Sequence, residues 1–176
     1  MKMILSLCSL MAILGLCSRD KFGTIAKGNN EKPEGSIKSY EYSYSGTMAY
    51  PIEYYEIKRL EDGTVQLGWS KDDNDIHLIR VADTALARIG KIAEENRLYK
   101  IKRSYYPKMQ VLDGYGWHFY MTFESGSISS GGSNAGPGQQ HSNTINSINS
   151  FIESLIEAST PADSLGIAYH YDYGDN

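Results

Sequence analysis

The sequence contains little cysteine, little histidine and no excess of positive charge, and this composition disfavours several classes of function. It has 2 cysteines and 4 histidines in 176 residues, and its 17 Lys and Arg against 21 Asp and Glu give a net charge of -4. Binding to nucleic acid through bulk positive charge is therefore excluded. The glycine pattern of dinucleotide sites and the lysine of a phosphate-binding P-loop are also missing. We expect no cofactor, no metal site and no nucleic-acid partner.

An apolar run preceded by one cation, Lys2, opens the chain. The run from Met3 to Leu16 is shorter than the roughly 20 apolar residues that a transmembrane helix needs, and it is typical of a secretory signal peptide. Its end, Leu14-Gly15-Leu16-Cys17, resembles the bacterial lipobox, in which the signal peptidase cuts before a lipidated cysteine. We therefore expect residues 1–16 to be a signal peptide. Secretion without a lipid and a buried N-terminal helix are the alternatives.

Lipidation at Cys17 would anchor the protein to a membrane of a bacterial cell envelope, at the outer membrane or facing the periplasm. The segment that follows is rich in Lys, Gly, Asn and Glu and has almost no apolar periodicity. Such a composition buries too little surface to offset its ordering entropy. We expect residues 17–36 to be a lipid-anchored flexible tether and residues 37–176 to form one domain.

Alternation of apolar and polar residues predicts most of the strands in this domain. The clearest runs from Trp117 to Glu124, with His118 and Tyr120 on the face opposite Trp117. Asp-Gly pairs at 62–63 and 113–114 are typical of tight hairpin turns. The other strands are expected at 40–44, 52–60, 65–69, 76–81, 98–103, 109–112 and 127–130, and the tail 169–173 is either an edge strand or disordered.

Two segments have helical spacing instead. Helices are expected at about 84–96, with Asp83 as a side-chain cap, and at about 143–158, begun by Ser142 or Asn143. Hairpins interrupted by two helices, without strand-helix alternation, predict an α+β fold. We expect an antiparallel sheet of about 6–8 strands with both helices packed on one face.

A glycine-rich stretch at residues 129–138 is the first candidate for ligand binding. Successive glycines let backbone amides converge on a phosphate or carboxylate, so the stretch is either such a nest or a structural connection. The candidate residues there are Ser129, Ser130, Gly131, Gly132, Ser133 and Asn134.

Tyrosine is the compositional outlier, with 14 residues against 2 Trp and 4 Phe. It combines apolar surface with a polar tip, which suits recognition of sugars, peptides or proteins, although it also suits half-buried strands. We expect His118 and Tyr120 on the open face of the sheet. Tyr40, Tyr42 and Tyr44 either join them there or belong to the core.

Two stretches, residues 113–117 (DGYGW) and 128–137 (ISSGGSNAGP), resemble uncharacterised lipoproteins of gut bacteria. The resemblance implies an envelope location and assigns no activity. The leading hypothesis is a lipid-anchored, non-catalytic binding or accessory module for a glycan, peptide or protein. An inhibitor of a foreign protease or lysozyme, with a loop at 129–137 or 71–75 plugging a cleft, is one alternative. A serine hydrolase, with Ser129 or Ser130 beside His118 or His141, is another.

Overall fold

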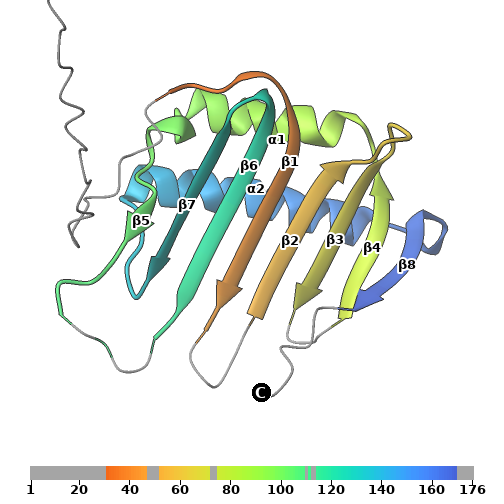
Figure 1. Cartoon of the computed structure of the whole chain (residues 1–176). Coiled ribbons are helices and arrows are strands. Elements are labelled where there is room, and N and C mark those ends of the chain that lie inside the picture. Colours follow the sequence, from red (N-terminus) through yellow and green to blue (C-terminus); the bar gives the residue numbers. More distant parts are fainter. Residues whose placement is uncertain (1–30, 47–51, 72–74, 110, 112–113, 170–176) are drawn as a thin grey trace, which may run out of the picture.

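In the described residues, one eight-stranded sheet, two α-helices and two short 3-10 helices make up the fold (Figure 1). The computed structural model describes residues 31–46, 52–71, 75–109, 111 and 114–169. The expected signal peptide, the lipidation site Cys17 and most of the expected tether lie outside these ranges.

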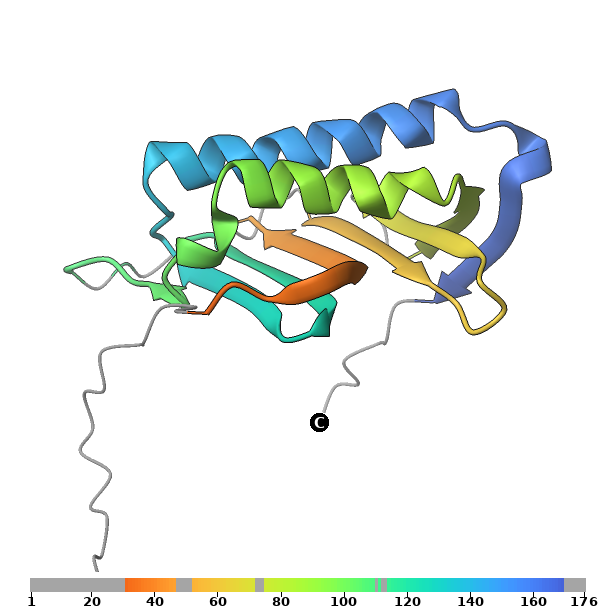
Figure 2. The same cartoon turned by 90° about the horizontal axis from the view of Figure 1, so that it is seen from above.

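Five strands and the first helix come first along the chain: β1 (Glu34–Ser45), β2 (Ile52–Arg59), β3 (Val65–Lys71), β4 (Asp75–Val81), α1 (Thr84–Glu95), the 3-10 helix η1 (Leu98–Lys100) and β5 (Ser104–Tyr105). They are followed by β6 (Gly116–Ser125), β7 (Ser127–Ser133), α2 (Gln139–Ala158), the 3-10 helix η2 (Pro161–Asp163) and β8 (Ser164–Tyr169). The spatial order is β5-β7-β6-β1-β2-β3-β4-β8, and every neighbouring pair is antiparallel except β5 and β7. Figure 2 shows both helices on one face of the sheet, so the predicted α+β fold is confirmed.

The core lies between this face and the helices. Apolar side chains that alternate along the strands meet the apolar stripes of α1 and α2. In β1, Ile37 and Tyr40 are both buried although they are three residues apart, because the pairing with β6 shifts register between Ile37 and Ser39. The largest fully buried side chains are Tyr40, Tyr55, Phe119, Ile57, Leu67, Leu86, Ile89, Leu98, Ile101, Met121, Ile148 and Ile152.

Polar contacts also hold α2 against the sheet. The Tyr40 hydroxyl donates to Asn149 Oδ1 at 2.7 Å. One helical turn further, Glu153 Oε1 accepts from the Tyr55 hydroxyl at 3.1 Å and from Lys71 Nζ at 2.7 Å. Because Asn149 and Glu153 are four residues apart, they lie on the same side of α2 and bind residues of the three neighbouring strands β1, β2 and β3.

The expected strand at 98–103 is wrong. Leu98 and Ile101 are both buried and three residues apart, and this is the spacing of the 3-10 turn η1 that the chain forms there. Arg97, in a left-handed conformation at φ 53, ends α1 and lets the chain enter that turn. Only the two residues of β5 then pair with the sheet. Of the expected strand at 109–112, Met109 and Val111 are exposed outside any strand, and its other two residues lie outside the described ranges.

The boundaries of three other elements differ from expectation. β1 begins at Glu34, inside the expected tether, and just before it Lys32 forms an ion pair with Glu94 of α1 at 2.5 Å. α2 begins at Gln139, where the Gly138 carbonyl accepts from the first turn; the expected starter, Ser142, instead donates to the Pro137 carbonyl at 3.1 Å. β8 ends at Tyr169, where the expected tail strand was to begin, and residues 170–176 are outside the described ranges.

The expected side-chain cap of α1 is also absent. Asp83 occupies the N-cap position, but its side chain makes no capping hydrogen bond. Its carboxylate lies 3.6 Å from an Arg59 guanidinium nitrogen, and this contact turns it toward the end of β2.

Candidate functional site

The face of the sheet opposite the helices is open, as the strand alternation predicts. His118 and Tyr120 are exposed there, with 38% of Tyr120 accessible, and their partners on β1 are Ser43 and Glu41. This confirms the predicted position of both residues, and their role in binding stays a prediction.

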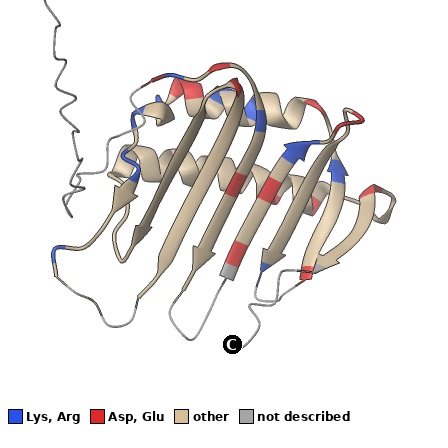
Figure 3. Ribbon diagram, in the orientation of Figure 1, with Lys and Arg blue, Asp and Glu red and all other residues tan. Residues whose placement is uncertain are grey.

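Acidic residues of β1 and β2 lie side by side in the middle of the sheet (Figure 3). Glu41 of β1 and Glu56 of β2 are direct neighbours, an arrangement that is repulsive unless it is compensated. Lys58 compensates it with an ion pair to Glu56 at 2.8 Å. Burial and these two carboxylates raise the pKa of Tyr54, which keeps its hydroxyl protonated. The face is therefore polar, as expected of an antiparallel sheet with one side in water.

Tyr40, Tyr42 and Tyr44 lie on the other face, toward the helices. Tyr40 is fully buried, and Tyr42 and Tyr44 pack against the core from its margin. Burial, with Glu53 and Tyr44 nearby, raises the pKa of Tyr42 to about 12. The sequence allowed these three rings either on the open face or in the core, and in the structure they lie on the core side of the sheet.

Half of the glycine-rich stretch is strand rather than loop, because β7 continues to Ser133. Ser130 is only 1% exposed, and its hydroxyl donates to the Lys102 carbonyl at 2.6 Å. Gly131 and Gly132 allow close packing: a Cβ on Gly131 would lie 2.9 Å from the Trp117 carbonyl, and one on Gly132 would lie 2.7 Å from Trp117 Nε1. These three residues hold β7 between β6 and β5.

Asn134 closes the end of the β6-β7 pair. Its φ of 50 is left-handed, a conformation that Asn tolerates better than most residues. The backbone N–H of Asn134 donates to the Tyr115 carbonyl at 2.9 Å, and the side-chain Oδ1 of Asn134 accepts from the backbone N–H of Tyr115 at 2.9 Å. Ser130, Gly131, Gly132 and Asn134, which were expected to form an anion nest, therefore have structural roles; Ser129 lies on the open face and Ser133 is exposed.

The expected serine-histidine pairs are not assembled around Ser130. It faces the helices, whereas His118 is on the open face. His141 is bound to the backbone of Arg97, and partial burial lowers its pKa. Ser129 pairs with Tyr120 and shares the open face with His118. The inhibitor hypothesis needs a protruding loop, but residues 129–133 of the proposed loop at 129–137 form part of the sheet. Residues 72–74 of the other proposed loop lie outside the described ranges.

A hollow of about 190 Å³ lies beside the N-terminal half of α2, and we call it the aromatic pocket. Its aromatic wall contains Tyr44 and Tyr115, whose rings stack with centroids 5.8 Å apart at an angle of 24°. Trp117 lines it as well, and its Nε1 donates to the Ala135 carbonyl at 2.7 Å. The complete lining is Tyr42, Tyr44, Tyr115, Trp117, Gly136, Pro137, Ser142, Ile145 and Asn146.

The polar side of this pocket comes from α2. Asn146 is exposed, and in the part of the chain that the structure describes its side chain has no hydrogen-bond partner. Ser142, one turn earlier, donates to the Pro137 carbonyl, and this bond holds two of the lining residues together. None of the lining residues carries a formal charge. The pocket therefore combines a fixed aromatic surface with an amide that is free to bind.

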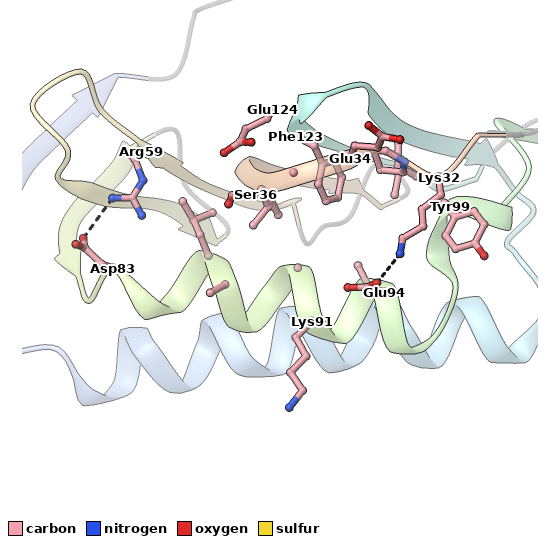
Figure 4. Close-up of a pocket in the computed structure, with 18 residues that line it drawn as sticks. Lys32, Glu34, Ser36, Arg59, Asp83, Lys91, Glu94, Tyr99, Phe123 and Glu124 are labelled. Atoms are coloured by element: carbon pink, nitrogen blue, oxygen red, sulfur yellow. Dashed lines mark hydrogen bonds and ion pairs between the residues drawn. The ribbon is translucent and has the colours of Figure 1, made fainter.

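A larger groove of about 810 Å³ lies between α1 and the start of β1, and we call it the α1 groove (Figure 4). Leu86, Ile37 and Phe123 contribute apolar side chains to it. Ion pairs are present at both ends, Arg59 with Asp83 and Lys32 with Glu94. The Lys32 interaction lowers the pKa of Glu94. These pairs connect the start of β1 and the end of β2 to α1, and the mixed charges select no single ligand class.

No protein-family model matches the chain, and no curated protein is significantly similar to it. Within the described ranges there is no group of three or more acidic, histidine or cysteine residues that could hold a metal ion. Neither α1 nor α2, nor any other helix in these ranges, is long and apolar enough to cross a membrane. The functional conclusion therefore depends on the geometry of the pocket.

Sequence reasoning left Tyr44 either on the open face or in the core, and it did not single out Tyr115, Trp117 or Asn146 as possible binding residues. A signal for part of the set exists, because Tyr115 and Trp117 belong to one of the two stretches that carry the lipoprotein resemblance, and Pro137 belongs to the other. Asn146 has no such signal. It is one polar residue among several on α2.

Proposed function

We propose that the protein is a lipid-anchored module of the bacterial cell envelope that binds its ligand in the aromatic pocket and catalyses no reaction. The observation that carries this proposal is the meeting of three distant segments at one hollow: the end of β1, the start of β6 and the first half of α2. Concave sites with an apolar lining and a few convergent polar groups are the default binding sites of proteins.

The pocket also favours binding over catalysis. Its polar groups are a serine, an asparagine and tyrosine hydroxyls, and none of its lining residues is a histidine or a carboxylate that could move a proton near neutral pH. Partial burial raises the pKa of Tyr42 to about 12, so this phenol is a poor base. A site of this composition can hold a ligand and orient it.

The membrane anchor is proposed from the lipobox-like sequence that ends at Cys17. Radiolabelled palmitate supplied to the native host tests it. We expect the wild-type protein to become labelled and Cys17→Ser to remain unlabelled with its apolar N-terminus uncut. Equal labelling of both proteins, or labelling of neither, would refute the anchor.

Binding is tested with arrays of glycans, peptides and envelope proteins probed with the purified protein. Tyr44→Ala removes one ring of the pocket, and Tyr120→Ala removes a tyrosine of the open face as the matched control. We expect at least one bound ligand to be lost with Tyr44→Ala and kept with Tyr120→Ala. If Tyr44→Ala folds normally and retains every interaction, the pocket is not the binding site. Loss with Tyr120→Ala alone would move the site to the open face.

A further inference from the structure

The geometry points to one neutral pyranose ring of a glycan as the occupant of the aromatic pocket, stacked on its aromatic wall and hydrogen-bonded by Asn146. This inference rests on the proposed function and specifies the ligand class. Three properties of the pocket carry it: its size, its lack of charge and the state of its polar groups.

The size of the pocket limits the occupant to a single ring. Pockets that enclose drug-sized ligands have volumes of about 300–1,000 Å³. The aromatic pocket has about 190 Å³. A longer ligand would therefore place one unit in the pocket and leave the others in solvent, as the end of a glycan chain would do.

The absence of charge excludes ionic recognition. No Lys, Arg, Asp or Glu lines the pocket. An anionic sugar or a phosphate would enter without a cation to pair with, and a cationic ligand without a carboxylate, so each would lose hydration without compensation. A neutral ring with hydroxyl groups avoids this cost.

The polar groups favour hydroxyls over a peptide. The Asn146 side-chain amide both donates and accepts, as a sugar hydroxyl does. The Trp117 Nε1 group, which is the indole donor that could hold a peptide carbonyl, is already bound to the Ala135 carbonyl. Proline-rich peptides also need an extended aromatic groove, whereas this pocket holds one ring. Tyrosine rings supply the apolar surface on which the C–H face of a sugar can lie.

The test uses neutral and charged sugars as probes. Cellotriose, maltotriose, mannotriose and N,N′-diacetylchitobiose, with galacturonic acid trimer and a proline decapeptide for comparison, are titrated into the purified protein by calorimetry. We expect at least one neutral probe to bind. Asn146→Ala should then weaken binding roughly threefold to tenfold, the range for one lost hydrogen bond. Asn143→Ala, which changes an exposed Asn on the same helix outside the pocket lining, should leave binding unchanged.

A second variant blocks the pocket without straining the chain. A Cβ on Gly136 meets nothing within 4 Å, and Gly136 lines the pocket, so Gly136→Leu adds a bulky side chain at the pocket lining without a clash. We expect it to abolish sugar binding while its unfolding midpoint stays near that of the wild type.

Several results would overturn the inference: no neutral probe binds, the galacturonic acid trimer binds as tightly as the neutral sugars, or sugar binding survives Gly136→Leu. If the proline decapeptide binds, no sugar binds, and Gly136→Leu abolishes the peptide binding, the ligand class is wrong and the proposed pocket function remains supported. If Tyr44→Ala retains every interaction that the wild type shows on the arrays, the proposed function itself is refuted.

Discussion

Gly132→Ala tests whether the glycine-rich stretch is needed for packing rather than for binding an anion. A methyl group at this position would lie 2.7 Å from Trp117 Nε1 and 3.1 Å from the Tyr105 carbonyl, and it would overlap the Ala135 carbonyl. Cβ contacts under 3.0 Å essentially never occur, and the overlapping atom is backbone. The chain from β7 to Ala135 must therefore move away from β6.

The cost follows from two effects. Forcing an additional methyl into a packed site costs about 1–3 kcal/mol. The movement also breaks the hydrogen bond between Trp117 Nε1 and the Ala135 carbonyl, which adds about 0.5–1.5 kcal/mol. We expect Gly132→Ala to lower the free energy of unfolding by about 2–4 kcal/mol, adding these two ranges and allowing for partial relaxation.

Urea unfolding followed by tryptophan fluorescence measures this cost, and Gly136→Ala is the matched control. Gly136 lies in the same stretch, and a Cβ there meets nothing within 4 Å. Its substitution should change stability by less than about 0.5 kcal/mol. Equal stability of the two variants would refute the packing role of Gly132. A stable Gly132→Ala protein that lost anion binding would instead support the nest.

Three further predictions concern the sheet and its contacts. Tyr40→Phe should cost about 0.5–1.5 kcal/mol in urea unfolding, and a double-mutant cycle with Asn149→Ala should show the same coupling; additive effects would deny the hydrogen bond. Lys71 lowers the pKa of Glu153 from 4.5, so the pair stabilises the fold above pH 4.5 and this contribution is lost as the pH falls through the folded-state pKa. Glu153→Gln should therefore be less stable than the wild type by under about 1 kcal/mol at pH 7, with a difference that shrinks as the pH falls below 4.5, and a constant difference would contradict this. Tyr120→Ala should change stability by less than about 0.5 kcal/mol, because this ring is on the open face; a larger loss in thermal unfolding would show that it packs.

Local periodicity was sufficient to predict most of the fold. The alternation from Trp117 to Glu124 appears as β6, and the helical spacing of Leu86 and Ile89 appears as the buried stripe of α1. The two helices on one face of an antiparallel sheet follow from the order of these elements. The segment at 98–103 was not predicted correctly, because a single helical turn is too short to show a helical period in the sequence, and a short run of mixed residues of this length is also typical of a strand.

The binding site could not be predicted in the same way. Alternation shows that Tyr42 and Tyr44 share a face, but not which face meets the helices, because that depends on pairing with β6 about 75 residues later. Glycines indicate a nest or close packing equally, and only the position of Trp117 beside Gly132 decides between them. The aromatic pocket needs segments from three elements, so no local pattern contains it.

The position of β1 in the middle of the sheet determines how the domain would respond to mechanical load. β1 is bonded to β2 on one side and to β6 on the other, so it joins the two halves of the sheet. A pull on the chain at Glu31 runs directly into this strand. Force along its axis shears two hydrogen-bond ladders together, whereas pulling on β8, which has one neighbour, unzips a single ladder. Tension from the N-terminal side therefore first meets a strand that is held on both sides, not an edge strand.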